Sequence, residues 1–197
     1  VLEQAEHLLG ESYKDAAARA NKIIAVSENT KHDLGEMYGI AEDKAEVIYP
    51  GLPHPVSLSS QGEGKNDYFL YFGTFEPRKN IEGVLAAYEN YYLQSRIKRP
   101  LVVAGSSGWK TRIVIPEELG GRITIKQNAS EGEKINLYQN AFAFMFPSFY
   151  EGFGFPVFEA AQLGVPVITS YSSSLCEVSK DFALFVNPFR PAQIADA

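Results

Sequence analysis

Six short, mostly apolar runs alternate with helix-like segments after residue 67, and this alternation limits the possible folds more than any other feature. These runs read as strands and cover 68–73, 101–105, 122–126, 141–146, 165–169 and 183–186. Strands that are apolar at nearly every position are buried on both faces, which is typical of a parallel sheet. We therefore predict an α/β fold, a Rossmann-like parallel sheet with helices on both faces.

The strand-to-helix loops are the expected place for a site, because ligands of such sheets bind at the carboxyl ends of the strands. Helices are expected after Asn80, over 134–140 and over 157–163. The loops 73–80 and 147–160 each follow a strand and precede a helix. Both contain unusual combinations of glycine and charged residues, so they are the candidates for a functional site.

The N-terminal part of the chain has a different organisation. The Ala- and Glu-rich segment 2–20 predicts a helix, and the apolar run 23–26 predicts a short strand. Ser27 or Asn29 is expected to cap a second helix, which ends at Gly39.

A linker is predicted between the two parts of the chain. Residues 51–66 are rich in proline, glycine and serine, which is typical of a loop or linker. The expected organisation is therefore an N-terminal part over 1–50, a linker over 51–66 and an α/β domain over 67–197.

Composition excludes several functional classes. The net charge of −6 gives no reason to expect nucleic acid as a partner. Cys176 is the only cysteine, so a disulfide within the chain is impossible and a zinc site built on cysteines is not expected. No apolar run approaches the ~20 residues that span a bilayer, and the N-terminus lacks the features of a signal peptide. We expect a soluble, cytoplasmic protein, with peripheral membrane contact left open.

The first informative loop, GTFEPRKN, suggests an anion site. Gly73 permits close approach of the backbone, and Arg78 and Lys79 can neutralise a phosphate. A helix N-terminus already carries a partial positive charge, so two cations beside it repel that charge unless an anion lies between them. The alternative is a basic loop exposed to solvent.

The second loop, PSFYEGFGFPVFEA, has a carboxylate at each end. Gly152 and Gly154 allow tight backbone geometry, and Pro156 is placed to open a helix at its first position. Glu151 is expected on the loop and Glu159 in the first helical turn, with both facing one pocket.

The two carboxylates match the hydroxyl groups of sugars. A carboxylate has two acceptor oxygens and can hold a vicinal diol, so Glu159 suits a ribose and Glu151 a sugar ring. The alternatives are an exposed loop acid at Glu151 and simple stabilisation of a helix N-terminus at Glu159.

These motifs resemble glycosyltransferase family 4, whose members have two Rossmann-like domains in the GT-B fold. EGFGFPVFEAAQLGVPVITS resembles the E-x7-E region of that family, and FGTFEPRKN resembles its diphosphate-binding loop. AVSENTKHDL followed by VIYPG resembles the passage from the first domain into the second. The resemblance implies that 1–50 is the remnant of the acceptor-side domain. It also implies that 67–197 is the donor-binding domain, incomplete at its C-terminus.

The resemblance also implies roles for individual residues. Arg78 and Lys79 would bind the donor diphosphate and stabilise the leaving nucleotide, and Glu151 would contact the transferred sugar. These three residues would be the catalytic ones. Glu159 would hold the ribose hydroxyls, and the stretch 125–128 falls where the base lies. The other implied donor-binding residues are Gly73, Gly152, Phe153, Gly154 and Phe155.

The implied activity is a retaining transfer of sugar from a UDP-, GDP- or ADP-linked donor to a glycan, lipid or small-molecule acceptor, as in polysaccharide biosynthesis. No D-x-D motif occurs, so neither a metal nor another cofactor is expected. The alternatives are a non-catalytic nucleotide-sugar-binding module, a related epimerase and a phosphorylase. Because acceptor-side residues would come from the missing N-terminal domain, we expect this chain to bind a nucleotide but not to catalyse transfer alone.

Overall fold

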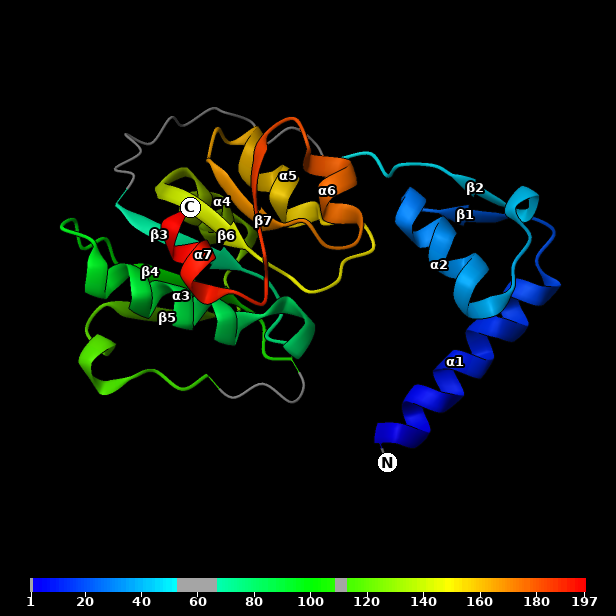
Figure 1. The fold of residues 1–197 in the computed structure, drawn as a ribbon, viewed down its shortest axis with the longest axis horizontal. Coiled ribbons are helices and arrows are strands. Elements are labelled where there is room, and N and C mark those ends of the chain that lie inside the picture. The colour runs from blue at the N-terminus through cyan, green and yellow to red at the C-terminus, as the bar shows by residue number, and fades with distance from the viewer. Residues whose placement is uncertain (1, 53–66, 109–112) are drawn as a thin grey trace. The chain divides into compact units, whose positions relative to one another are not determined.

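The structure, a computed structural model, describes residues 2–52, 67–108 and 113–197 (Figure 1). The chain divides into two compact units, Val1–Gly51 and Leu52–Ala197. Apart from its first two residues, the predicted linker 51–66 lies outside the described residues. That the first unit is the remnant of an acceptor-side domain stays a prediction.

The first unit contains the helices and the first strand expected from its sequence, and a second strand that ends at Val47, where the sequence also indicates a short extended piece over Val47 and Ile48. Its elements are α1 (Leu2–Arg19), β1 (Ile23–Ala25), α2 (Glu28–Tyr38), a 3-10 turn (Glu42–Lys44) and β2 (Ala45–Val47). Strands β1 and β2 pair in parallel. Of the two predicted caps, Ser27 is the one that begins α2, since its side chain accepts a hydrogen bond from the Thr30 N–H. Gly39 ends the helix in the left-handed conformation with φ of 66°.

The second unit is built on a six-stranded parallel sheet, which confirms the predicted fold class. Its strands are β3 (Tyr68–Phe72), β4 (Leu101–Gly105), β5 (Ile123–Gln127), β6 (Ala141–Phe146), β7 (Val167–Ser170) and β8 (Ala183–Val186). Their order is β5-β4-β3-β6-β7-β8, and every pair is parallel. The chain order reverses between the neighbours β3 and β6, which makes their carboxyl ends the expected place for a ligand.

Helices flank this sheet. They are α3 (Ile81–Gln94), α4 (Glu131–Gln139), α5 (Phe155–Gln162), α6 (Ser174–Ser179) and α7 (Pro191–Asp196), with 3-10 turns at Pro77–Lys79 and Glu117–Leu119. Helices α3 and α7 pack against each other, whereas α4, α5 and α6 contact β6 or β7 (Figure 1). The core between these layers includes Tyr71, Phe144 and Phe146, all without solvent exposure. Their burial explains why these strands are apolar along almost their whole length.

Side-chain caps fix where two of these helices begin. Asn80 begins α3 as predicted, and its side-chain oxygen accepts the Gly83 N–H at 3.2 Å. Helix α4 begins three residues earlier than predicted, because Ser130 and Glu133 form a capping box. Among the described residues, no helix is long and apolar enough to cross a membrane.

Candidate functional site

Two glycines bring the loops after β3 and β4 into close contact. Gly105 has φ of 149°, and a Cβ atom there would lie 1.8 Å from the Gly73 carbonyl oxygen. The loops are joined by hydrogen bonds from Gly73 N–H to Ala104 O at 3.0 Å and from Phe75 N–H to Ser106 O at 2.9 Å. Only glycine fits at Gly105, since any side chain would separate the two loops.

A pocket of about 310 Å³ opens at the carboxyl ends of β3, β4 and β5. Its walls come from the three strand-to-helix loops and from the helices α4 and α5. The residues that line it are Phe72, Gly73, Thr74, Lys79, Gly105, Ser106, Asn128, Ala129, Lys134, Pro156 and Glu159. The pocket therefore lies where parallel sheets bind their ligands. One buried lysine and one carboxylate from the predicted site line the same space.

Lys79 is a buried cation on the wall of this pocket. It lies at the end of the turn Pro77–Lys79 and is only 8% exposed. Its Nζ donates a hydrogen bond to Glu151 Oε1 at 2.6 Å and lies 4.9 Å from the centre of the Phe146 ring. Burial lowers the pKa of the Lys79 ammonium, while the nearby Glu151 carboxylate acts in the opposite direction. The alternative of a basic loop exposed to solvent is therefore wrong for Lys79.

Glu151 lies between the two cations of the first loop. Its Oε2 accepts a hydrogen bond from Arg78 Nη1 at 2.9 Å, while its Oε1 accepts from Lys79. Glu151 is 5% exposed, so it is not an exposed loop acid. Arg78 is more open to solvent and also pairs with Glu76 at 3.0 Å. The anion that the sequence required between the two cations is thus supplied by the protein itself.

Glu151 and Glu159 do not face the same pocket, which corrects the expectation from the sequence. Glu159 lines the pocket, whereas Glu151 is absent from its lining and points at Arg78 and Lys79. The physical reason is charge compensation, because a lysine as buried as Lys79 needs an anionic partner within hydrogen-bond distance.

Glu159 is held by two partners from α4. Lys134 Nζ donates to Glu159 Oε1 at 3.1 Å, and Tyr138 Oη donates to Oε2 at 3.2 Å. Burial and the negative charge of Glu159 raise the pKa of Tyr138 well above its ordinary value, so this hydroxyl remains a donor. Burial alone would lower the pKa of Lys134, but Glu131 and Glu159 together raise it. The Glu159 carboxylate is thus fixed in orientation on the pocket wall.

Helix α5 begins at Phe155, one to two residues earlier than the sequence predicts. Gly154 is its cap, so Pro156 is its second residue rather than its first. Glu159 then falls beyond the first turn, which contains no acidic residue. Simple stabilisation of the helix N-terminus is therefore not the role of Glu159.

The predicted loop 152–155 is shaped by one glycine and three packed aromatic rings. Gly154 has φ of 99°, and a Cβ atom there would lie 2.7 Å from Leu175 Cδ2. Phe153 is buried and stacks on Phe158 at 5.1 Å between ring centres, with Phe155 edge-on at the same distance. Gly152 precedes this group on the loop. These rings fix the direction in which the chain enters α5.

Two residues have wider roles than the sequence indicates. Asn80 was identified as a helix cap, but its side-chain nitrogen also donates to Pro147 O at 2.9 Å and to Pro188 O at 2.8 Å. It therefore joins the loops that follow β3, β6 and β8. Lys134 was not identified as a site residue, and no local signal marks it, because its partner Glu159 is 25 residues away.

A second, larger cavity lies at the other end of the strands. It has a volume of about 560 Å³ and is lined mainly by apolar residues of α3, α7 and the amino ends of β6 and β7. None of the predicted site residues lines it. A large apolar cavity with few polar groups does not match the polar motifs of the chain, so the smaller pocket is the candidate site.

Comparison with known families decides the identity of this arrangement. The sequence profile described as glycosyl transferases group 1 matches residues 58–197. The chain belongs to this family. A second profile, Glycosyltransferase Family 4, matches residues 3–54 of the chain. The resemblance inferred from the E-x7-E and EPRKN motifs is therefore confirmed.

Curated relatives are named as mannosyltransferases of O-antigen synthesis. The chain is 41% identical over 125 residues to the O-antigen chain mannosyltransferase B of Escherichia coli, which covers 61% of the chain and 33% of that protein. It is 30% identical over 178 residues to the O-antigen chain mannosyltransferase RfbU of Salmonella typhimurium, with 89% and 49% covered. The chain therefore spans about a third to a half of the length of these relatives.

Solved structures share the fold. A glycosyltransferase from Rickettsia africae superposes with a TM-score of 0.71 at 21% identity, over 94% of this chain and 55% of that one. WaaG, a glycosyltransferase involved in lipopolysaccharide biosynthesis, superposes with a TM-score of 0.68 at 17% identity, over 89% and 52%. These structures are GT-B glycosyltransferases, so the predicted fold family is confirmed.

Proposed function

We propose that the chain is the donor-binding part of a retaining glycosyltransferase that takes its sugar from a nucleoside diphosphate. The observation that carries the proposal is one pocket lined by the cation Lys79, by the fixed carboxylate of Glu159 and by the two glycines in contact, Gly73 and Gly105. A diphosphate binds to a cation and to nearby backbone N–H groups, and the two hydroxyl groups of a ribose bind to a hydrogen-bond acceptor such as a carboxylate. The pocket offers both at the carboxyl ends of the strands.

The diphosphate is assigned to the side of the pocket at Lys79. Gly73 and Gly105 both line the pocket, and their contact holds the backbone of two loops on its wall, where phosphate oxygens can meet it. The Lys79 ammonium has three N–H donors and gives one to Glu151, so donors remain for the pocket that it lines. Departure of the nucleotide develops negative charge on the diphosphate, and a fixed cation stabilises that charge without reorganisation.

The ribose is assigned to Glu159. Both oxygens of this carboxylate lie on partners from α4, so its orientation is fixed before a ligand arrives. A vicinal diol can donate two hydrogen bonds to such a carboxylate. Lys134 lines the same pocket and is 18% exposed at its side chain, so it can also reach a ligand there. The base is assigned to the neighbouring 125–128 stretch, of which Asn128 lines the pocket.

Glu151 keeps the proposed place beside the transferred sugar, and it adds a second role. Its carboxylate neutralises Arg78 and Lys79. Arg78, at 44% side-chain exposure, is the more exposed of the two cations, so its long side chain has room to turn from Glu151 toward a diphosphate. Arg78, Lys79 and Glu151 are thus proposed as the catalytic group, with no metal or other cofactor required.

The names of the relatives support a sugar and an acceptor class. We propose that mannose is the transferred sugar, since several relatives are named as mannosyltransferases. We also propose that the acceptor is a growing glycan of the O-antigen kind, since two of these names specify the O-antigen chain. The base of the donor is left among uridine, guanosine and adenosine. Cytoplasmic location and peripheral membrane contact of the whole protein belong to the same proposal.

Calorimetry with nucleoside diphosphates and their mannose and glucose conjugates tests the proposal. Glu159→Ala removes two hydrogen bonds to a charged acceptor, worth about 1.5–3 kcal/mol each, so affinity for the best nucleotide should fall by at least about 10-fold. Glu131→Ala is the matched control, because Glu131 also pairs with Lys134 but does not line the pocket. Equal affinities for Glu159→Ala and the parent chain would contradict the ribose role.

Assays of the same protein distinguish the competing activities. Binding of a nucleotide sugar without transfer, even with the complete protein, would favour the non-catalytic module. Conversion of the sugar at its own C2 would favour an epimerase. Anomeric analysis of the product by NMR tests retention, and a product with inverted configuration would contradict it.

A further inference from the structure

Two neighbouring serines hold the backbone of Glu151 from both sides. The Glu151 N–H donates to Ser173 Oγ at 2.8 Å, and Ser174 Oγ donates to the Glu151 carbonyl oxygen at 2.8 Å. Ser174 has no solvent exposure. These serines lie 22 and 23 residues after Glu151 and precede or begin α6. We refer to Ser173 and Ser174 as the serine clasp.

Ser173 has a backbone conformation that a serine rarely adopts. Its φ is 51° and its ψ is −140°, a region populated almost entirely by glycine. Such a conformation is strained for a residue with a Cβ atom, so glycine would be the expected residue if only the backbone mattered. What serine adds over glycine is the Oγ atom that accepts the Glu151 N–H. We therefore attribute the presence of a serine in this strained conformation to the hydrogen bond that its Oγ atom accepts.

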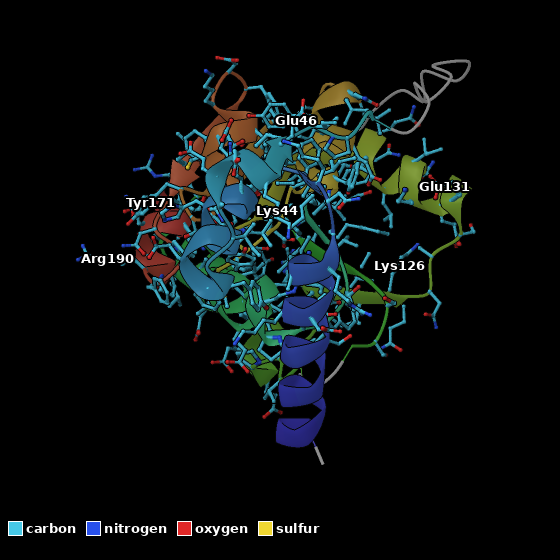
Figure 2. All side chains as sticks on the ribbon, turned by 90° about the vertical axis from the view of Figure 1, so that its right-hand side faces the viewer. Lys44, Glu46, Lys126, Glu131, Tyr171 and Arg190 are labelled. Carbon is cyan, nitrogen blue, oxygen red and sulfur yellow. The ribbon has the colours of Figure 1, made fainter. Side chains whose placement is uncertain are left out.

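The clasp belongs to a wider contact between the loop after β6 and the loop after β7. Leu175 follows the clasp and lies against Gly154, where a Cβ atom would lie 2.7 Å from Leu175 Cδ2 and the φ of 99° disfavours any residue with a side chain. Ser170, the last residue of β7, donates to the Ser148 carbonyl oxygen. Between them, Tyr171 is 53% exposed and lies at the margin of the second unit in Figure 2. The clasp thus fixes Glu151 from a loop that is itself close to the surface.

We propose that Ser173 and Ser174 are positioning residues of the donor site, which act through Glu151. The two serines hydrogen-bond to the backbone N–H and the backbone carbonyl of Glu151. Glu151 thereby keeps its carboxylate between Arg78 and Lys79, and Lys79 stays oriented on the pocket wall. The inference rests on the proposed function, because it assigns the clasp to donor binding. It adds residues from outside both predicted loops to the site.

Substitution of Ser173 by alanine and by glycine separates function from stability. Both variants lose the Oγ atom, so both should weaken binding of the best nucleoside diphosphate by about 10-fold, which corresponds to one hydrogen bond. Only alanine keeps the Cβ atom. The glycine variant should therefore unfold with an equilibrium constant at least about 5-fold smaller than that of the alanine variant. If Ser173 served stability alone, the glycine variant, which is the more stable of the two, would also bind the nucleotide more tightly than the alanine variant.

Hydrogen exchange tests the clasp without a ligand. The Glu151 amide should exchange at least about 10-fold faster in both Ser173 variants than in the parent chain, because its acceptor is gone. Ser179→Ala is the matched control, since Ser179 is a buried serine of α6 that donates to Leu175 O. It should lower stability but leave the exchange of the Glu151 amide and nucleotide affinity unchanged.

The outcomes separate this inference from the proposed function. Faster Glu151 exchange with weaker nucleotide binding in both Ser173 variants supports the clasp. Faster exchange with unchanged affinity overturns the positioning role and leaves the donor site intact. Unchanged exchange overturns the clasp itself. If the parent chain binds none of the nucleoside diphosphates, the proposed function fails, and the inference that rests on it fails with it.

Discussion

The ion pair of Glu151 and Lys79 offers the sharpest energetic test of this site. In Glu151→Gln, Lys79 loses its partner while its side chain remains 10% exposed. Breaking a buried pair from one side costs about 3–5 kcal/mol, because an uncompensated charge stays buried. Lys79 can release its proton in response, since burial already lowers its pKa. We therefore expect Glu151→Gln to lower the free energy of unfolding by about 3 kcal/mol at pH 7.

The double variant Glu151→Gln/Lys79→Met removes both charges and thereby separates the pair from the rest of the loop. Methionine preserves much of the apolar stem, so the double variant should be more stable than Glu151→Gln alone. The coupling energy of the cycle should reach about 2 kcal/mol or more. Urea unfolding followed by circular dichroism measures it, with the slope m checked for constancy across the four proteins.

Arg78 provides the matched control for this cycle. It also pairs with Glu151 but has a side chain that is 44% exposed, so solvent screens the interaction. The coupling between Glu151→Gln and Arg78→Met should be at most about 1 kcal/mol. A coupling below about 0.5 kcal/mol for the Lys79 cycle would refute the reasoning, because the two changes would then be independent.

Three further predictions concern neighbouring residues. The pKa of Lys79 is lower in the folded chain than in the unfolded chain, so just below pH 10.5 the unfolded chain binds more protons than the folded one. The free energy of unfolding should therefore increase with pH in that range. Nucleotide affinity should fall over the same range as Lys79 loses its charge. Lys79→Met should bind more weakly at pH 7.5 without that decline, and a parallel decline in calorimetry would contradict the assignment. Asn80→Ala loses a cap and two buried hydrogen bonds and should destabilise by about 3 kcal/mol in urea. Ser148→Ala removes the buried hydroxyl that has no partner among the described residues, so its melting temperature should rise or stay equal, and a clear fall would show that the hydroxyl is bound.

The sequence by itself determined the fold class and indicated where the candidate site lies. Strands such as β4 and β6 are apolar at almost every position, and this pattern suffices for a parallel sheet covered by helices. Glycines and charges in the loops after β3 and β6 then indicated the carboxyl ends of the strands. The strands and the loop motifs could be predicted because both depend on the spacing of residues within a few positions of each other. The cap at Asn80 was predicted for the same reason.

Only the tertiary structure separated the two glutamates. In sequence, Glu151 and Glu159 are equivalent ends of one motif, and both were expected in one pocket. In the fold, Glu151 is drawn to Lys79, which is 72 residues away in the chain, because a buried ammonium needs an anion. Glu159 meets Lys134 and Tyr138 on another helix instead. The parallel crossover connections bring loops that are distant in sequence together at one edge of the sheet. No local sequence pattern marks such pairs of residues, so only the tertiary structure identifies them.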